Sequence, residues 1–175
     1  MQVCTCTSIV ERGGGRKLST DRIEREIKIA APIERVWAVL TEPAHVGTWF
    51  GNGSPAEIDL RPGGVMVLDH GEHGTYQTLI VNVDPPRAFS YRWAAGYPGV
   101  VATELNSTLV EFTLEAAAGG TLLRVVESGF DELVIPAGRE GSAGFESHSE
   151  GWTGVIARLG EYVEGRDESS LSPPE

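Results

Sequence analysis

Apolar side chains recur at helical spacing near the end of the chain. Between residues 145 and 163, the positions that share one helical face are apolar, with one histidine among them. This period predicts a single long helix with one apolar face, which must pack against another element. The positions on that face are Phe145, His148, Trp152, Val155, Ile156, Leu159, Tyr162 and Val163.

Most of the chain before this helix alternates between apolar and polar residues with a period of two, which is typical of strands. Sequences rich in glycine and proline separate the alternating segments, as turns do. Because the connections are short, we expect antiparallel pairing, since parallel strands need long crossovers. The expected strands are 23–30, 56–60, 64–69, 76–83, 88–94, 108–116 and 121–128.

Two short helices are expected after the first strand, at 32–40 and 44–49. Pro32 suits the start of the first helix, and Pro43 ends it. The sequence therefore predicts an α+β fold, in which a curved antiparallel sheet of about seven strands wraps around the C-terminal helix. Alternation within each strand predicts which side chains point inward, toward the concave face of the sheet. They are Leu79, Val81, Val83, Phe89, Tyr91, Trp93, Val110, Phe112, Leu114, Leu123 and Val125.

One helix cannot cover such a sheet completely, so the fold predicts an apolar cavity between helix and sheet. The alternative is that the same side chains interdigitate into a dry core, and apolar alternation alone does not separate the two.

The composition narrows the class of protein. A chain of 175 residues with 41% hydrophobic content suits one domain, for which we expect residues 22–166, with disordered segments at 1–21 and 167–175. The net charge of −11 disfavours nucleic acid as a partner. The sequence shows no apolar run long enough for a membrane span and no secretory signal, so we expect a cytoplasmic protein without membrane insertion. Cys4 and Cys6 are too close together to form a useful disulfide.

Several motifs occur in an order that resembles the START-like, or SRPBCC, helix-grip domains. The most similar branch is the activator of heat-shock-protein-90 ATPase homologues (AHSA-type). The resemblance covers roughly residues 23–166 and implies a helix-grip fold with a hydrophobic cavity. The motifs are Ile27 to Trp37 followed by Trp49-Phe50, then Arg61-Pro62-Gly63-Gly64, Tyr91-Arg92-Trp93, Gly120-Thr121, Glu127-Ser128-Gly129-Phe130 and Gly151-Trp152.

Members of this superfamily bind lipids, hormones or polyketides, and some catalyse cyclisation or dehydration. Our leading hypothesis is therefore a protein without a cofactor that binds a small hydrophobic molecule, either a lipid or an aromatic or polyketide metabolite. Relatives often pair, so a homodimer is possible. The candidate ligand-binding residues are Trp49, Phe50, Tyr76, Tyr91, Trp93, Phe112, His148, Trp152, Ile156 and Leu159.

An enzyme of the polyketide cyclase or dehydratase kind is the second hypothesis, and it would need an ionisable group in the cavity. Glu127 is in phase with Leu123 and Val125, and His148 lies on the apolar helix face, so these two are the weak catalytic candidates. For Glu127 we favour a place at the rim, paired with Arg124 or solvent. For His148 we favour a partly buried histidine without a catalytic role.

A metal site is one further interpretation of the sequence. Side chains of metal-ligand types cluster at Asp69, His70, Glu72 and His73. They span an expected turn, so we favour a polar hairpin tip and expect no metal. The third functional hypothesis is an interaction module acting on a chaperone, as the name of the branch suggests. It requires an exposed apolar patch.

Overall fold

The computed structural model describes residues 21–165. The expected terminal segments lie almost entirely outside this range, as do Cys4 and Cys6. In chain order the elements are β1 (Arg22–Ile29), α1 (Ile33–Thr41), α2 (Pro43–Trp49), β2 (Glu57–Ile58), β3 (Val65–Asp69), the 3-10 turn η1 (Gly71–His73), β4 (Thr75–Asp84), β5 (Ala88–Trp93), β6 (Thr108–Ala117), β7 (Gly120–Ser128), α3 (Glu140–Ala143) and α4 (Phe145–Glu164).

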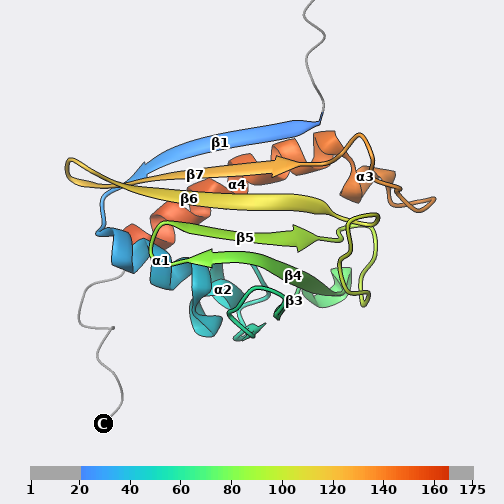
Figure 1. Cartoon of the computed structure of the whole chain (residues 1–175), viewed down its shortest axis with the longest axis horizontal. Helices are drawn as coiled ribbons and strands as arrows, with labels where there is room; N and C mark the ends of the chain where they lie inside the picture. The colour runs from blue at the N-terminus through green and yellow to red at the C-terminus, as the bar shows by residue number, and fades with distance from the viewer. Residues whose placement is uncertain (1–20, 166–175) are drawn as a thin grey trace, which may run out of the picture.

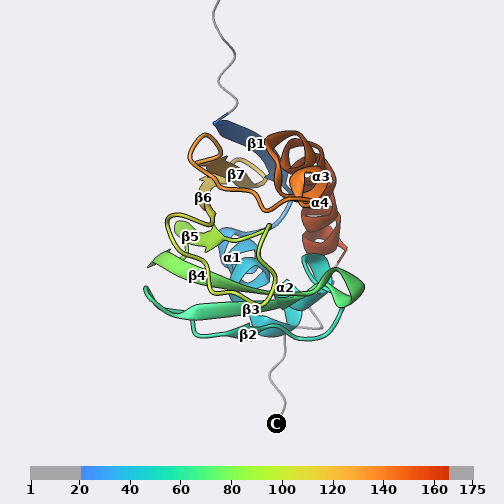
Figure 2. The same cartoon turned by 90° about the vertical axis from the view of Figure 1, so that its right-hand side faces the viewer.

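The strands form one sheet in the order β1-β7-β6-β5-β4-β3-β2, and neighbouring strands run antiparallel. Figure 1 shows α4 crossing behind β1, β7 and β6, and α1 and α2 covering the other end of the same face. The view from the side shows the sheet curving around these helices (Figure 2). The α+β helix-grip architecture expected from the sequence is therefore confirmed.

The close approach of α4 to β1 depends on a small residue. Gly160 is buried on α4, and a Cβ atom there would stand 2.9 Å from Cδ1 of Ile27 on β1. At the other end of the contact, a guanidinium nitrogen of Arg25 donates to both the carbonyl and the hydroxyl oxygen of Ser149, at 2.9 Å each. The helix is thus fixed against the edge strand by packing at one end and hydrogen bonds at the other.

The inward phase expected for β4 is wrong in the first half of the strand. Tyr76, Thr78 and Ile80 point into the core, whereas Leu79 is half-buried and Val81 is exposed. The cause is a break in register with β5 between Ile80 and Asn82, typical of a β-bulge. The extra residue reverses the alternation of inward and outward side chains. The expected inward positions are therefore correct at the end of the strand and wrong before the bulge.

The inward side chains expected for β5, β6 and β7 are correct. Phe89, Tyr91, Val110, Phe112, Leu114, Leu123 and Val125 are buried in one core cluster, and Trp93 packs against it. Helix α3 was not expected. The 3-10 turn η1 lies in the turn that was expected beside His70 and His73, and the strand expected at 56–60 shortens to Glu57–Ile58. No helix within residues 21–165 is long and apolar enough to cross a membrane.

Candidate functional site

A cavity of about 170 Å³, here called the inner cavity, lies between strands β5 to β7 and α4. Helix α3 borders it through Ser142, and Phe50 borders it at the end of α2. Aromatic rings make up much of its wall. The remaining lining residues are Tyr91, Trp93, Val110, Glu127, Ser147, His148, Gly151, Trp152 and Val155.

Glu127 lies in this wall with only 1% of its surface exposed. It is the penultimate residue of β7 and follows Leu123 and Val125 on the inward face of the strand. The rim position that we favoured from the sequence is therefore wrong. A carboxylate so deeply buried needs strong hydrogen-bond donors, because an unpaired buried charge is very costly.

Three side chains donate to the Glu127 carboxylate. Thr108 Oγ1 lies 2.5 Å and His148 Nδ1 2.8 Å from Oε1, while Trp152 Nε1 lies 2.6 Å from Oε2. The donors come from β6 and from two successive turns of α4. Hydrogen bonds to an ionised acceptor are the strong class, so this group both stabilises the carboxylate and attaches α4 to the sheet.

The hydrogen bond to Glu127 also fixes the histidine tautomer. Because the carboxylate accepts, Nδ1 of His148 carries a proton, and Nε2 is the ring nitrogen left for other partners. Among residues 21–165, the hydrogen bond of the His148 ring is the one between Nδ1 and Glu127. The His148 side chain is 9% exposed, and its ring meets Phe130 edge-on at 5.5 Å.

Tyr91 is the unusual member of the wall. Its hydroxyl is buried and has no hydrogen-bond partner among residues 21–165. Burial, assisted by the charge of Glu127, raises the pKa of Tyr91 well above its ordinary value, so the hydroxyl keeps its proton. In the sheet register Tyr91 pairs with Val110, which in turn pairs with Glu127. The cavity wall thus presents a buried donor that lacks an acceptor, two strands away from a carboxylate.

His70 is not part of a polar hairpin tip. It lies after β3 and meets the rings of Phe50, Tyr76 and Trp93 edge-on at 5.7, 5.3 and 5.6 Å. Burial lowers the pKa of His70, which favours the neutral ring. His73 is exposed, as expected for the turn. Within residues 21–165, no three His, Cys, Asp or Glu side chains gather in a way that could hold a metal ion.

The structure divides the expected ligand-binding residues into two groups. Phe50, Tyr91, Trp93, His148 and Trp152 line the inner cavity. Trp49 instead lines a neighbouring cleft, Phe112, Ile156 and Leu159 belong to the core cluster, and Tyr76 is also buried. The sequence analysis missed Gly151 and Val155, although their spacing from His148 was a usable signal. Nothing in the sequence pointed to Ser142, because α3 was not expected.

Replacing Glu127 with glutamine tests the group of three donors. The amide has one oxygen and one NH₂, so at least one of Thr108, His148 and Trp152 would face a donor instead of an acceptor. We expect Glu127→Gln to lower the free energy of unfolding by about 1–3 kcal/mol in urea denaturation. Glu111→Gln is the matched control, because Glu111 is exposed on the neighbouring strand β6 and should change stability by less than about 0.5 kcal/mol. Equal effects of the two substitutions would contradict the assignment.

Comparison with known proteins agrees with the observed fold. Residues 30–164 match the model of the family described as Activator of Hsp90 ATPase homolog 1-like protein. Among curated proteins no match was found. Of the solved structures, MLL2253 of Mesorhizobium loti superimposes with a TM-score of 0.64 at 22% identity, covering 83% of this chain and 98% of the other.

Two further structures superimpose with a TM-score of 0.61. The dimeric Aha1 of Colwellia psychrerythraea is 18% identical over 82% of this chain and 96% of its own. DynU16, a protein of the dynemicin biosynthetic locus, is 25% identical over 82% of this chain and 47% of its own. The family match spans most of the chain and the neighbours share its architecture. The chain therefore belongs to the Activator of Hsp90 ATPase homolog 1-like family, the AHSA-type branch of the START-like/SRPBCC superfamily.

Proposed function

We propose that this protein binds a small, mainly apolar molecule in the inner cavity, and that the molecule carries a hydrogen-bond acceptor. The observation that carries this proposal is the Tyr91 hydroxyl, a buried donor without a partner in the described structure. An unpaired buried donor costs free energy, which an acceptor on a ligand would recover. Carbonyl and ether oxygens are acceptors of this kind.

The size and lining of the inner cavity support an aromatic ligand. At about 170 Å³ it is close to the roughly 150 Å³ engineered cavity that holds benzene, so it suits one ring or a short aliphatic group. Trp93, Trp152 and Phe50 supply flat apolar walls, with Phe50 and Trp152 stacked at 6.2 Å. Flat aromatic walls favour a flat ligand.

A pair of probes isolates the contribution of the hydroxyl. Ethylbenzene and acetophenone have nearly the same shape, but acetophenone has a carbonyl oxygen. We expect Tyr91→Phe to weaken acetophenone binding about three- to tenfold, the value of one neutral hydrogen bond, and to leave ethylbenzene binding unchanged. Affinities can be measured from NMR shift changes and from the rise in melting temperature.

Tyr97→Phe is the control variant. Tyr97 is half-buried and its hydroxyl donates to the Val134 carbonyl at 2.9 Å, outside the inner cavity. This substitution should change neither affinity. If the wild-type protein binds neither probe, or if Tyr91→Phe weakens both probes equally, the proposed role of the hydroxyl is wrong.

A second candidate function is acid/base catalysis in the same cavity, of the polyketide cyclase or dehydratase kind. The observation that favours it is the pairing of His148 with the buried Glu127, which orients the ring and leaves Nε2 able to accept a proton. The neighbour DynU16 comes from a biosynthetic locus, which supports the same direction. In this reaction Nε2 removes a proton from the carbon next to a carbonyl, while the Tyr91 hydroxyl donates to the enolate oxygen.

Proton exchange at carbon detects this chemistry without knowledge of the natural substrate. In D₂O, the methyl protons of bound acetophenone pass to His148 and deuterons return to the same carbon. We expect exchange above the buffer rate, and a loss of about 10²-fold or more in His148→Gln. Both proteins are compared at saturating acetophenone, so that a change in affinity is not counted as a loss of exchange. Exchange at the buffer rate in the wild-type protein would contradict catalysis and leave the binding proposal intact.

The expected homodimer and the chaperone-linked interaction module stay predictions. Exposed apolar side chains do occur between β5 and β6, at Val100, Val101 and Leu105. Exposure alone does not indicate which partner they would meet.

A further inference from the structure

A second hollow, here called the outer cleft, adjoins the inner cavity. Its volume is about 430 Å³, and it lies between the end of α2 and the second half of α4. Phe50 and Val155 line both spaces. The two hollows are therefore neighbours that share part of their walls.

One face of α4 runs through both spaces. His148, Gly151, Val155, Arg158 and Tyr162 follow one another at intervals of three or four residues, which places them in one stripe of the helix. The first two line the inner cavity, Val155 lines both spaces, and the last two line the outer cleft. At 1.5 Å per residue this stripe extends about 21 Å. The hollows are thus consecutive along a single helix face.

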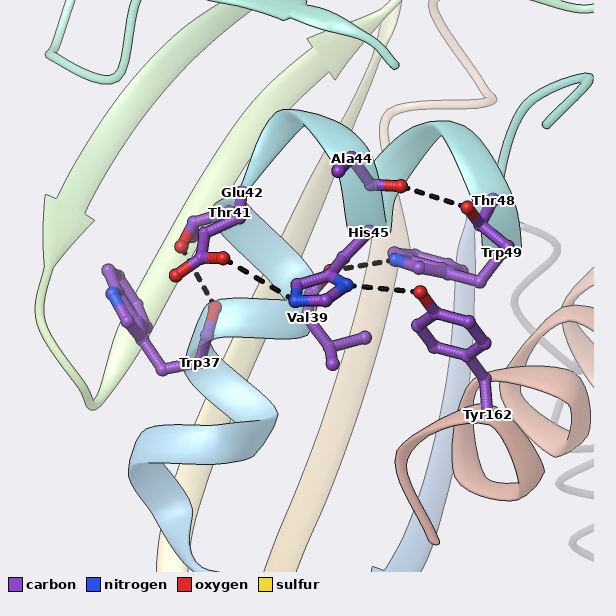
Figure 3. Close-up of polar contacts among 9 residues, drawn as sticks. All are labelled: Trp37, Val39, Thr41, Glu42, Ala44, His45, Thr48, Trp49 and Tyr162. Atoms are coloured by element: carbon purple, nitrogen blue, oxygen red, sulfur yellow. Dashed lines mark hydrogen bonds and ion pairs between the residues drawn. The ribbon is translucent and has the colours of Figure 1, made fainter. Parts of the chain in front are cut away.

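Two walls of the outer cleft are fixed by hydrogen bonds, as Figure 3 shows. Trp49 Nε1 donates to the Val39 carbonyl at 2.8 Å, which holds the indole against α1. The Tyr162 hydroxyl lies 3.0 Å from Nδ1 of His45, which joins α4 to α2. These contacts link α2 to α1 on one side and to α4 on the other.

Phe50 is held differently. Its ring is half-buried, packs against the core, and meets four aromatic rings: Trp49 at 5.0 Å, Trp93 at 5.4 Å, His70 at 5.7 Å and Trp152 at 6.2 Å. It follows the last residue of α2 and precedes Gly51. To join the two hollows, the ring must turn aside and give up part of this packing, and a ligand ring that takes its place would restore contacts of the same kind.

The charges at the two ends differ in sign. The carboxylate of Glu127 lies in the inner cavity, where it repels an anion. Arg158 lines the outer cleft, is exposed, and forms no ion pair with any residue in the range 21–165. An elongated anion would therefore lie with its neutral end at Tyr91 and its charge at Arg158.

We propose that the inner cavity and the outer cleft form one elongated site for an organic anion, with Phe50 as a movable partition. The ligand class is an aromatic or aliphatic body of more than one ring that ends in a carboxylate or a similar group. Together the two spaces reach the 300–1,000 Å³ that is usual for ligand pockets. This inference rests on the proposed function, because it extends the same cavity.

Two fluorescent probes separate the charge from the apolar body. N-phenylnaphthylamine and anilinonaphthalene sulfonate share three aromatic rings, and only the second carries an anionic group. We expect both to bind, and Arg158→Gln to weaken the sulfonate about two- to fivefold, as an exposed charge pair should, while the neutral probe is unaffected. The difference should disappear at about 1 M salt, where the Debye length is about 3 Å. Arg61→Gln, an exposed arginine on the loop between β2 and β3, is the charge-matched control.

Filling the passage tests whether the two hollows are joined. Val155→Trp should weaken both three-ring probes about tenfold or more, whereas Ala157→Trp on the exposed face of α4 should change nothing. Should Val155→Trp fail to fold, the Arg158 arm still decides, since Arg158 is exposed.

The outcomes separate this proposal from the one on which it rests. If acetophenone binds but neither three-ring probe does, the elongated site is wrong and the proposed function stands. If the probes bind but Arg158→Gln affects both equally, the assignment of the charged end is overturned. If nothing binds, both proposals fail.

Discussion

A carboxylate buried between a sheet and a helix has to be matched by donors, and this requirement organises the molecule around Glu127. Its two oxygens accept hydrogen bonds from Thr108 on the adjacent strand and from His148 and Trp152 on α4. The apolar face of α4 turns it toward the sheet, but the hydrophobic effect by itself has no direction. Hydrogen bonds do have direction, so the carboxylate adds a constraint on the rotation of α4 and on its position along the sheet, beside the Gly160 contact and the Arg25 hydrogen bonds.

The same requirement explains why a cavity persists beside the carboxylate. Trp152 must turn its indole nitrogen to Glu127, and His148 must turn Nδ1 to it, so neither ring is free to fill the inner cavity that both of them line. The Tyr91 hydroxyl is then left without an acceptor. The orientations that Trp152 and His148 need for their hydrogen bonds therefore oppose complete packing of the interior. Incomplete packing beside polar groups is common in ligand-binding sites.

The sequence predicted the architecture well because period and turn chemistry are local signals. The long helix from Phe145 was predicted within a residue or so of its observed end, and the inward phase of β5, β6 and β7 was correct. The bulge in β4 was not predictable, because one extra residue at Val81 leaves no mark in an alternating pattern. The alternation in a sequence therefore does not predict which side chains point inward where the register between two strands changes.

The candidate site was predicted in part. Glu127 was in the correct phase, yet the base rate for carboxylates favoured the rim, since they are seldom fully buried unless paired. What decided its position was the donor set, and Thr108, His148 and Trp152 lie up to 25 residues away along the chain. Such a partnership exists only once the strands and α4 have assembled. His70 was misjudged for the same reason, because its aromatic neighbours come from separate elements.

Hydrogen exchange of the indole N–H groups, followed by NMR, tests the central claim most directly. If Glu127 accepts from Trp152 in the folded protein, the Trp152 indole proton should resonate downfield and exchange much more slowly than that of the half-buried Trp37, whose indole donates to no residue in the described structure. An indole proton of Trp152 that exchanges as fast as that of Trp37 would contradict the account.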